Sequence, residues 1–187
     1  MIYLKYVVFD QENFSQNEAS TALRDYILYV AFGVKNAKSR VVVGDHGKPY
    51  IKGTDFDFSA AHTSGAAVAA VCGKGRRVKG VILIDKNVSR IGVDIEAHSR
   101  PLSLKAVRLI SNKYFSEKER DYLALCTDGY RERFLEIWTR KESIIKATGK
   151  GLSSISIADS FDSRIKYIRT EHIAVKGKKY IVSIAGI

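Results

Sequence analysis

The chain has 187 residues, 45% of them hydrophobic, a net charge of +11 and two cysteines, Cys72 and Cys126. This length suits one compact domain or two small fused halves, and two cysteines without metal-ligand spacing argue against a disulfide framework and favour a reducing cytoplasm. The positive charge favours a polyanionic partner, which could be nucleic acid, a membrane surface, an acidic protein or a phosphorylated small molecule.

The first half is predicted to contain one helix and several strands. Residues 2–9 are rich in β-branched and aromatic side chains, which predicts a strand, and residues 17–30 have apolar side chains at helical spacing. No apolar run suits a signal peptide or a membrane span, so no membrane partner is expected. Further strands are expected at 39–43, 50–51, 56–59, 66–72, 78–84 and 90–96, with a polar interruption at 62–65 and a basic hairpin turn at 73–77.

The second half is predicted to be richer in helix. Residues 104–112 are amphipathic, and Ser116 with Glu119 has the capping-box spacing that predicts a new helix from Glu117. Residues 130–148 form the clearest helical pattern, which Gly149 would end. Closing strands are expected at 154–157, 165–169 and 180–184. Both halves therefore combine helix and strand, and we divide the chain into residues 1–90 and 91–187.

Two carboxylates share one face of the strand at 90–96. Side chains alternate along a strand, so Ile91, Val93 and Ile95 would face a core while Asp94 and Glu96 face the other way. Two carboxylates at such a short separation repel each other unless water or a cation lies between them. Oxygen ligands suit magnesium. Taken alone, the pattern is more typical of a half-exposed strand with an acidic outer face.

A second candidate group lies on the helix at 130–148. Glu142 and Lys146 are four residues apart and share a face, with Trp138 one turn earlier. A carboxylate and an ammonium beside a large aromatic ring could act as a base and a phosphate clamp. Such a pair is also a common surface ion pair, worth about 0.2–0.5 kcal/mol.

A third candidate group could bind phosphate. Lys48 lies in a glycine turn, and His62 lies among hydroxyl and glycine residues, although two ordinary turns would have the same composition. Neither 73–77 nor 150–151 has the spacing of a P-loop. The other histidines, His46, His98 and His172, have no zinc-site spacing around them.

Taken in order, these motifs resemble the phosphopantetheinyl transferases, and the long, surfactin-synthetase-activating (Sfp) type most of all. The resemblance runs from about Thr21 to Leu152 and is most specific in its last motif. The motifs are Gly47-Lys48-Pro49, Phe58 with His62, Gly92-Val93-Asp94-Ile95-Glu96, Phe115-Ser116 with Glu119, and Trp138 through Lys141-Glu142-Ser143 and Lys146 to Gly149-Lys150-Gly151-Leu152.

The resemblance implies an α+β fold of two pseudo-symmetric halves, with coenzyme A in the cleft between them. It implies magnesium-dependent transfer of 4′-phosphopantetheine to a serine of an acidic acyl or peptidyl carrier protein by a monomer. The implied roles are magnesium binding by Asp94, Glu96 and Glu142, proton removal by Glu142 directly or through water, and neutralisation or protonation of the leaving phosphate by Lys146. Coenzyme A contacts are implied for Thr21, Lys48, His62, Asp94 and Lys146.

The chain departs from the family pattern at Ala61, where the family has serine, so that Ser59, Thr63 or Ser64 would have to supply the hydroxyl. The region before the first helix is short, and we expect 73–77 to form a longer hairpin that supplies positive charge instead.

Two other functions remain open. A basic α+β RNA-binding module would place aromatic rings among basic residues on a sheet surface. Tyr3, Tyr6, Tyr167 and Tyr180 allow this, although nucleic acid gives no reason for the acidic residues. A carrier-binding homologue without activity is the other alternative.

Overall fold

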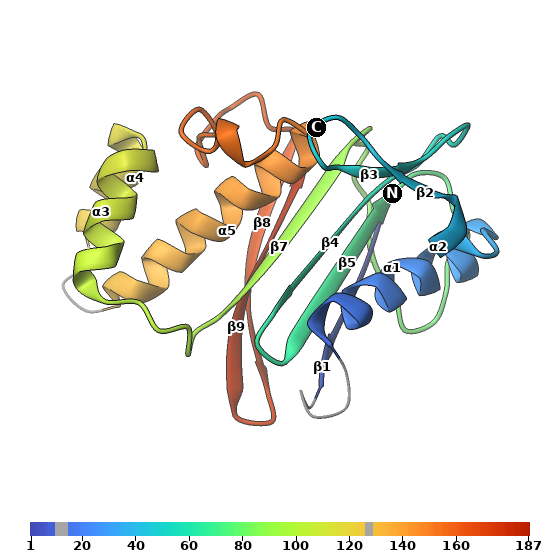
Figure 1. The fold of residues 1–187 in the computed structure, drawn as a ribbon, viewed down its shortest axis with the longest axis horizontal. Coiled ribbons are helices and arrows are strands. Elements are labelled where there is room, and N and C mark those ends of the chain that lie inside the picture. The colour runs from blue at the N-terminus through green and yellow to red at the C-terminus, as the bar shows by residue number, and fades with distance from the viewer. Residues whose placement is uncertain (10–14, 126–128) are drawn as a thin grey trace.

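The computed structural model describes residues 1–9, 15–125 and 129–187, so that Cys126 lies outside the described residues. Its order of elements is mixed α+β, as predicted (Figure 1). The helices are α1 (Gln16–Phe32), α2 (Ala37–Arg40), α3 (Leu104–Tyr114), α4 (Glu117–Ala124) and α5 (Tyr130–Thr148), with a 3-10 turn at Leu152–Ser154. The strands are β1 (Ile2–Val8), β2 (Val41–Val43), β3 (Pro49–Ile51), β4 (Asp57–Thr63), β5 (Ala66–Cys72), β6 (Ile82–Ile84), β7 (Ile91–Ala97), β8 (Tyr167–Val175) and β9 (Lys178–Gly186).

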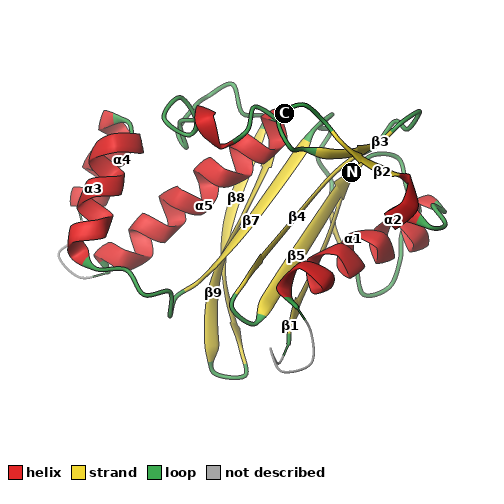
Figure 2. Ribbon diagram, viewed as in Figure 1, coloured by secondary structure: helices red, strands yellow, loops and turns green. Residues whose placement is uncertain are grey.

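The strands form two main antiparallel sheets that divide near residue 90. The N-terminal sheet has the order β4-β5-β1-β6, and the C-terminal sheet has the order β7-β9-β8, while β2 and β3 pair separately. Helix α1 covers one face of the N-terminal sheet and α5 covers one face of the C-terminal sheet (Figure 2). The opposite faces of the two sheets share a core in which Val68 and Val93 are fully buried. The layers therefore run helix, sheet, sheet, helix.

The two sheets meet along β4 and β7, whose contacts are made by side chains of β4 with the backbone of β7. The Ile91 amide donates to Asp57 Oδ2 at 2.8 Å and the Val93 amide to Ser59 Oγ at 3.1 Å. The Ala97 amide donates to Thr63 Oγ1 at 3.3 Å. Every second side chain of β4, except Ala61, thus accepts a hydrogen bond from a β7 amide, as a backbone carbonyl would in a continuous sheet. We call this row of contacts the β4–β7 ladder.

Helix α5 is anchored from several sides. Its residue Lys141 is fully buried and pairs with Glu119 Oε2 at 2.8 Å, while Ser160 N donates to the other oxygen of that carboxylate. Glu119 also completes the predicted capping box with Ser116. Because both ions are buried and paired, removing either partner alone would leave an uncompensated charge. The pair therefore fixes α4 and the loop near Ser160 against the helix.

Some predicted elements are wrong. Residues 73–77 form no hairpin turn, because β1 lies between β5 and β6; the segment instead contacts the start of β1 and the end of α1, where Arg76 N donates to Ala31 O. Residues 39–40 belong to α2, and 62–63 continue β4 because they pair with Ala67 and Ala66 of β5. Residues 154–157 form turns with local hydrogen bonds, and β8 begins only at residue 167.

No helix in the described ranges is long and apolar enough to cross a bilayer. The tyrosines required for base stacking are also poorly placed, because Tyr3 and Tyr180 are buried in the two cores. Tyr6 and Tyr167 pack against the core that joins the sheets. These four rings therefore form no exposed aromatic surface for RNA.

Candidate active site

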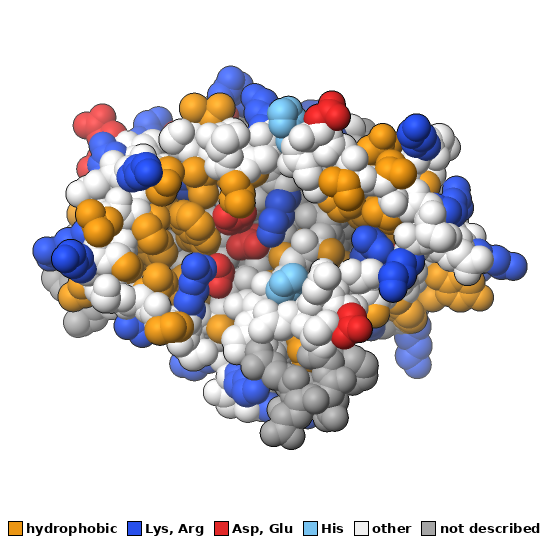
Figure 3. Space-filling view, viewed as in Figure 1, with side chains coloured by type: hydrophobic (Ala, Val, Ile, Leu, Met, Phe, Trp, Pro, Cys, Tyr) orange, Lys and Arg blue, Asp and Glu red, His pale blue; other side chains and the backbone are white. Residues whose placement is uncertain are grey.

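A pocket of about 560 Å³ lies between α1, β4, the β2–β3 turn and α5. In the space-filling view, acidic side chains lie in a hollow at the centre of this face, with a basic side chain and a histidine beside them (Figure 3). Five predicted site residues, namely Thr21, Lys48, His62, Glu142 and Lys146, line the pocket. Residues far apart in the sequence therefore surround one space.

The strand that carries Asp94 and Glu96 lies unusually close to α5. A Cβ atom on Gly92 would lie 1.9 Å from the Ser143 carbonyl oxygen and 2.5 Å from the Ala147 amide nitrogen. Only glycine therefore allows this approach. The close packing covers the acidic face of β7 with α5, so that face is not the solvated surface that a half-exposed strand would have.

Asp94 is the centre of the acidic group. Its Oδ1 accepts a hydrogen bond from Lys146 Nζ at 2.6 Å, while its Oδ2 is buried without a hydrogen-bond partner. Burial raises the pKa of Asp94 although Lys146 opposes the change. Burial and the Asp94 charge raise the pKa of Glu96 to about 7, and the same two causes raise the pKa of Glu142. Burial on the pocket side of β7 therefore favours the protonated forms of these acids, and a bound cation there would favour their charged forms.

The three carboxylates are close enough to shift one another's pKa values, but their oxygens do not surround a single metal position. Their ligand oxygens do not all lie within 4.8 Å of one another. Arg100 pairs with Glu96, and Lys146 pairs with Asp94. Arg100 had no predicted role, and its position four residues after Glu96 is the sequence signal that could have suggested it.

Lys48 lines the pocket, but its ammonium group is directed into the junction between the halves. It bonds to Asp57 Oδ2, and it donates to Ile91 O at 3.1 Å and Ala147 O at 3.3 Å. These bonds occupy its three donors, and burial lowers the pKa of Lys48. Lys48 thus connects β4, β7 and α5 at the pocket wall.

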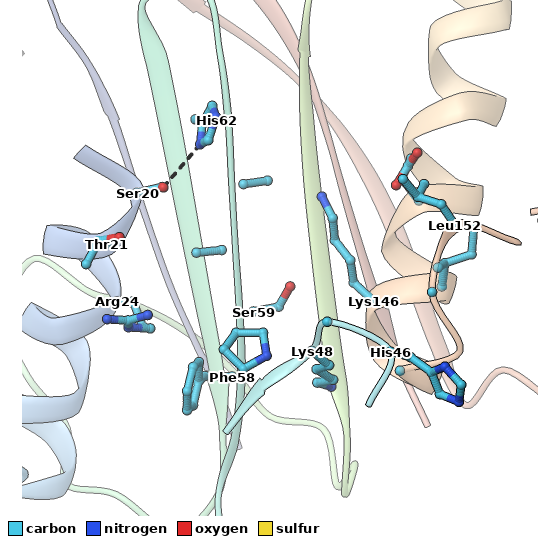
Figure 4. Close-up of a pocket in the computed structure, with 18 of the residues that line it drawn as sticks. Ser20, Thr21, Arg24, His46, Lys48, Phe58, Ser59, His62, Lys146 and Leu152 are labelled. Atoms are coloured by element: carbon cyan, nitrogen blue, oxygen red, sulfur yellow. Dashed lines mark hydrogen bonds between the residues drawn. The ribbon is translucent and has the colours of Figure 1, made fainter. Parts of the chain in front are cut away.

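The opposite wall comes from α1 (Figure 4). Ser20 Oγ lies 3.2 Å from His62 Nδ1, and burial, with a smaller effect of the Lys146 charge, lowers the pKa of His62. Thr21 and Arg24 also line the pocket, and the Arg24 guanidinium lies over the Phe58 ring. Ser20 and Arg24 were not predicted, although their spacing from residue 17 places them on one helical face.

The hydroxyl groups that could replace the one absent at Ala61 are partly occupied. Ser59 Oγ and Thr63 Oγ1 accept bonds in the β4–β7 ladder, although each hydroxyl can still donate. Ser59 lines the pocket together with Ala61, whereas Thr63 does not. Ser59 is therefore the better placed of the two.

Comparison with known proteins supports a relationship over much of the chain. A family model described as the 4′-phosphopantetheinyl transferase superfamily matches residues 90–184, just over half of the chain. A 4′-phosphopantetheinyl transferase of Bacillus subtilis is 33% identical over 138 residues, which make up 73% of this chain and 52% of that protein. The 4′-phosphopantetheinyl transferase Sfp of Bacillus subtilis strain 168 is 42% identical over 76 residues, or 40% of this chain and 31% of that one.

A third relative, the 4′-phosphopantetheinyl transferase gsp of Aneurinibacillus migulanus, is 29% identical over 133 residues, or 70% of this chain and 46% of that one. The chain thus spans about half the length of these curated relatives, or less. Among solved structures, a holo-[acyl-carrier-protein] synthase of Thermotoga maritima is similar with a TM-score of 0.37 and 14% identity, over 54% of this chain and 64% of that one.

Proposed function

This chain belongs to the 4′-phosphopantetheinyl transferase superfamily, and from that premise we propose that it transfers 4′-phosphopantetheine from coenzyme A to a serine hydroxyl of a carrier protein. The other product would be adenosine 3′,5′-bisphosphate. The observation that carries the proposal is the pairing of Lys146 with Asp94 beside Glu142, at the edge of a pocket large enough for a nucleotide.

Asp94, Glu96 and Glu142 would together bind a magnesium ion. Their donor set fits, because it consists of oxygen atoms alone and because the buried Asp94 Oδ2 lacks any other partner. Magnesium usually takes one or two carboxylates together with substrate phosphates, which suits acids that are spread more widely than a closed cage. When bound, the ion would supply positive charge to the pyrophosphate of coenzyme A.

Glu142 and Lys146 would handle the proton and the leaving group. The serine oxygen forms a bond to the phosphorus that carries pantetheine, and the bond from that phosphorus to the bridging oxygen breaks. Glu142 takes the serine proton, directly or through water, and its raised pKa makes it a stronger base than an ordinary glutamate. Lys146 neutralises or protonates the departing phosphate, for which it must release Asp94.

The nucleotide part of coenzyme A would lie between α1 and the β2–β3 turn. Thr21 and His62 would donate hydrogen bonds to it from one wall of the pocket. Lys48 would contribute positive charge from the other wall, and a direct bond to a phosphate would require its ammonium to exchange one of its present acceptors.

The carrier would be an acidic acyl or peptidyl carrier protein. A net charge of +11 speeds the encounter with an acidic partner, and this explanation of the charge does not require nucleic acid. We propose that the enzyme acts as a monomer, because residues 1–90 and 91–187 of one chain line both sides of the pocket. We also propose the reducing cytoplasm as its compartment, where a free Cys72 persists.

An intact-mass assay tests the proposal. The protein is mixed with an apo carrier protein, coenzyme A and magnesium, and a mass gain of one phosphopantetheine group is expected on the carrier. EDTA should abolish the gain because it removes magnesium, and Glu142→Ala should abolish it because it removes one of the carboxylates, while Glu171→Gln on β8 serves as a control that leaves the acidic group intact. If several different carriers gain no mass although coenzyme A binds, the chain is an inactive homologue.

A further inference from the structure

Three side chains that the proposed reaction does not use meet at the other end of α5. His98 follows β7, Glu132 lies in the first turn of α5, and His172 lies on β8. One ligand atom from each lies within 4.8 Å of the other two. Glu132 precedes Glu142 by ten residues of the same helix, which separates the two sites by about 15 Å along its axis.

His172 is oriented by a second carboxylate. Its Nδ1 lies 2.9 Å from Glu132 Oε1, and its Nε2 lies 2.9 Å from Glu136 Oε1. Tyr122 donates a hydrogen bond to the other oxygen of Glu136 at 3.0 Å. Histidines that bind metals usually bond through their second ring nitrogen to such an outer carboxylate, which fixes the ring and its tautomer.

His98 distinguishes this group from a simple ion pair. A charged His172 between two glutamates would be satisfied without any further residue. However, His98 Nε2 is buried without a hydrogen-bond partner and lies 4.0 Å from Glu132 Oε1. The backbone of His98 is fixed by its amide, which donates to Lys179 O at 3.0 Å. The group therefore contains one ring nitrogen that lacks a partner and is held beside a carboxylate.

We infer that His98, Glu132 and His172 form a zinc site. Two imidazole nitrogens and one carboxylate oxygen are a typical zinc donor set with an open fourth position for water. Ligand atoms around a tetrahedral zinc ion lie about 3.3 Å apart, between the 2.9 Å and 4.0 Å separations seen here. Small side-chain rotations would therefore complete the site.

Zinc at this position would join the end of β7, the start of α5 and β8. The first two of these elements also carry the acidic residues of the pocket, so zinc would stabilise the half that holds them. Sequence spacing could not show the site, because its ligands lie far apart in the chain and come together only through the packing of α5 on the C-terminal sheet.

A zinc titration tests the inference without coenzyme A or a carrier, so its outcome is independent of the transferase assay. Metal-stripped protein is titrated with Zn²⁺ against a chromophoric chelator, with excess magnesium present to compete for the acidic group. One equivalent should bind, His98→Gln and His172→Gln should each remove this binding, and Glu136→Gln should weaken it about 10- to 100-fold. His46→Gln is the matched control and should bind zinc as the wild type does.

X-ray absorption on the wild type loaded with one equivalent of zinc provides a readout that needs no variant. Two imidazole nitrogens and oxygen are expected at about 2.0–2.2 Å. Coordination by oxygen alone, or equal zinc binding by the wild type and both histidine variants, would overturn the inference.

Discussion

Gly92→Ala should separate the two elements that carry the acidic group. The new methyl carbon would lie 1.9 Å from Ser143 O, and because this is a helix backbone atom it cannot rotate away. An ordinary contact begins at 3.4 Å, so α5 would have to move about 1.5 Å from β7.

Two effects follow from that movement. Overpacking of this kind typically costs about 1–3 kcal/mol of stability. Glu142 and Lys146 would also shift relative to Asp94, and a misplacement of about 1 Å can reduce a reaction rate about 100-fold. We therefore expect kcat to fall about 100-fold, with a smaller change in coenzyme A binding because α1 does not move.

Urea unfolding measures the first effect, and the mass-gain rate at saturating substrate measures the second. Gly177→Ala is a suitable control, since an added Cβ at Gly177 would meet nothing within 4 Å, in contrast to Gly92, and only its φ of +75° opposes the substitution. It should lose about 1–2 kcal/mol through backbone strain alone and keep its kcat. Wild-type stability and rate in Gly92→Ala would refute the role of close packing in aligning the site.

Two further predictions concern Glu96 and Ala61. The pKa of Glu96 is raised from 4.5 to about 7 in the folded protein, so the folded state binds this proton more tightly than the unfolded state. With EDTA present to remove metal ions, the protonated Glu96 should therefore contribute stability below pH 4.5 that is lost as the pH rises to about 7. Urea unfolding at several pH values should show this slope, magnesium should restore stability at the upper end, and an unchanged slope in Glu96→Gln would contradict the assignment. Ala61→Ser should add a hydroxyl acceptor for the Ile95 amide in the β4–β7 ladder and raise the free energy of unfolding by about 0.5–1.5 kcal/mol; an unchanged urea midpoint would show that this amide is not available.

The sequence correctly predicted those elements whose ends are determined by residues nearby in the sequence. The bounds of α5 and its Gly149 cap match the prediction, because an apolar stripe and a left-handed glycine are encoded within the segment itself. The error at 73–77 arose because strand pairing is non-local: β1 takes the place beside β5 that a hairpin would have given to β6. At 154–157, local turn bonds prevailed over a short run that looked extended.

The site shows the same difference between features encoded locally in the sequence and features that depend on long-range packing. Alternation along a strand correctly separated Asp94 and Glu96 from the core-facing residues, but it could not show that α5 covers them. The turn motif identified Lys48 as a pocket residue, yet its three acceptors come from distant segments and were invisible in the sequence. Long-range packing decides which atoms of a recognised residue remain free.

The β4–β7 ladder also has a consequence for how this architecture can change. Backbone pairing between strands survives most substitutions, because every residue except proline carries the required amide and carbonyl. Where β4 meets β7, the hydrogen bonds come instead from Asp57, Ser59 and Thr63, so each of these bonds can be gained or lost by a single codon change. The fit between the halves is therefore adjustable in small heritable steps, and Ala61 marks a place where such a step is still open.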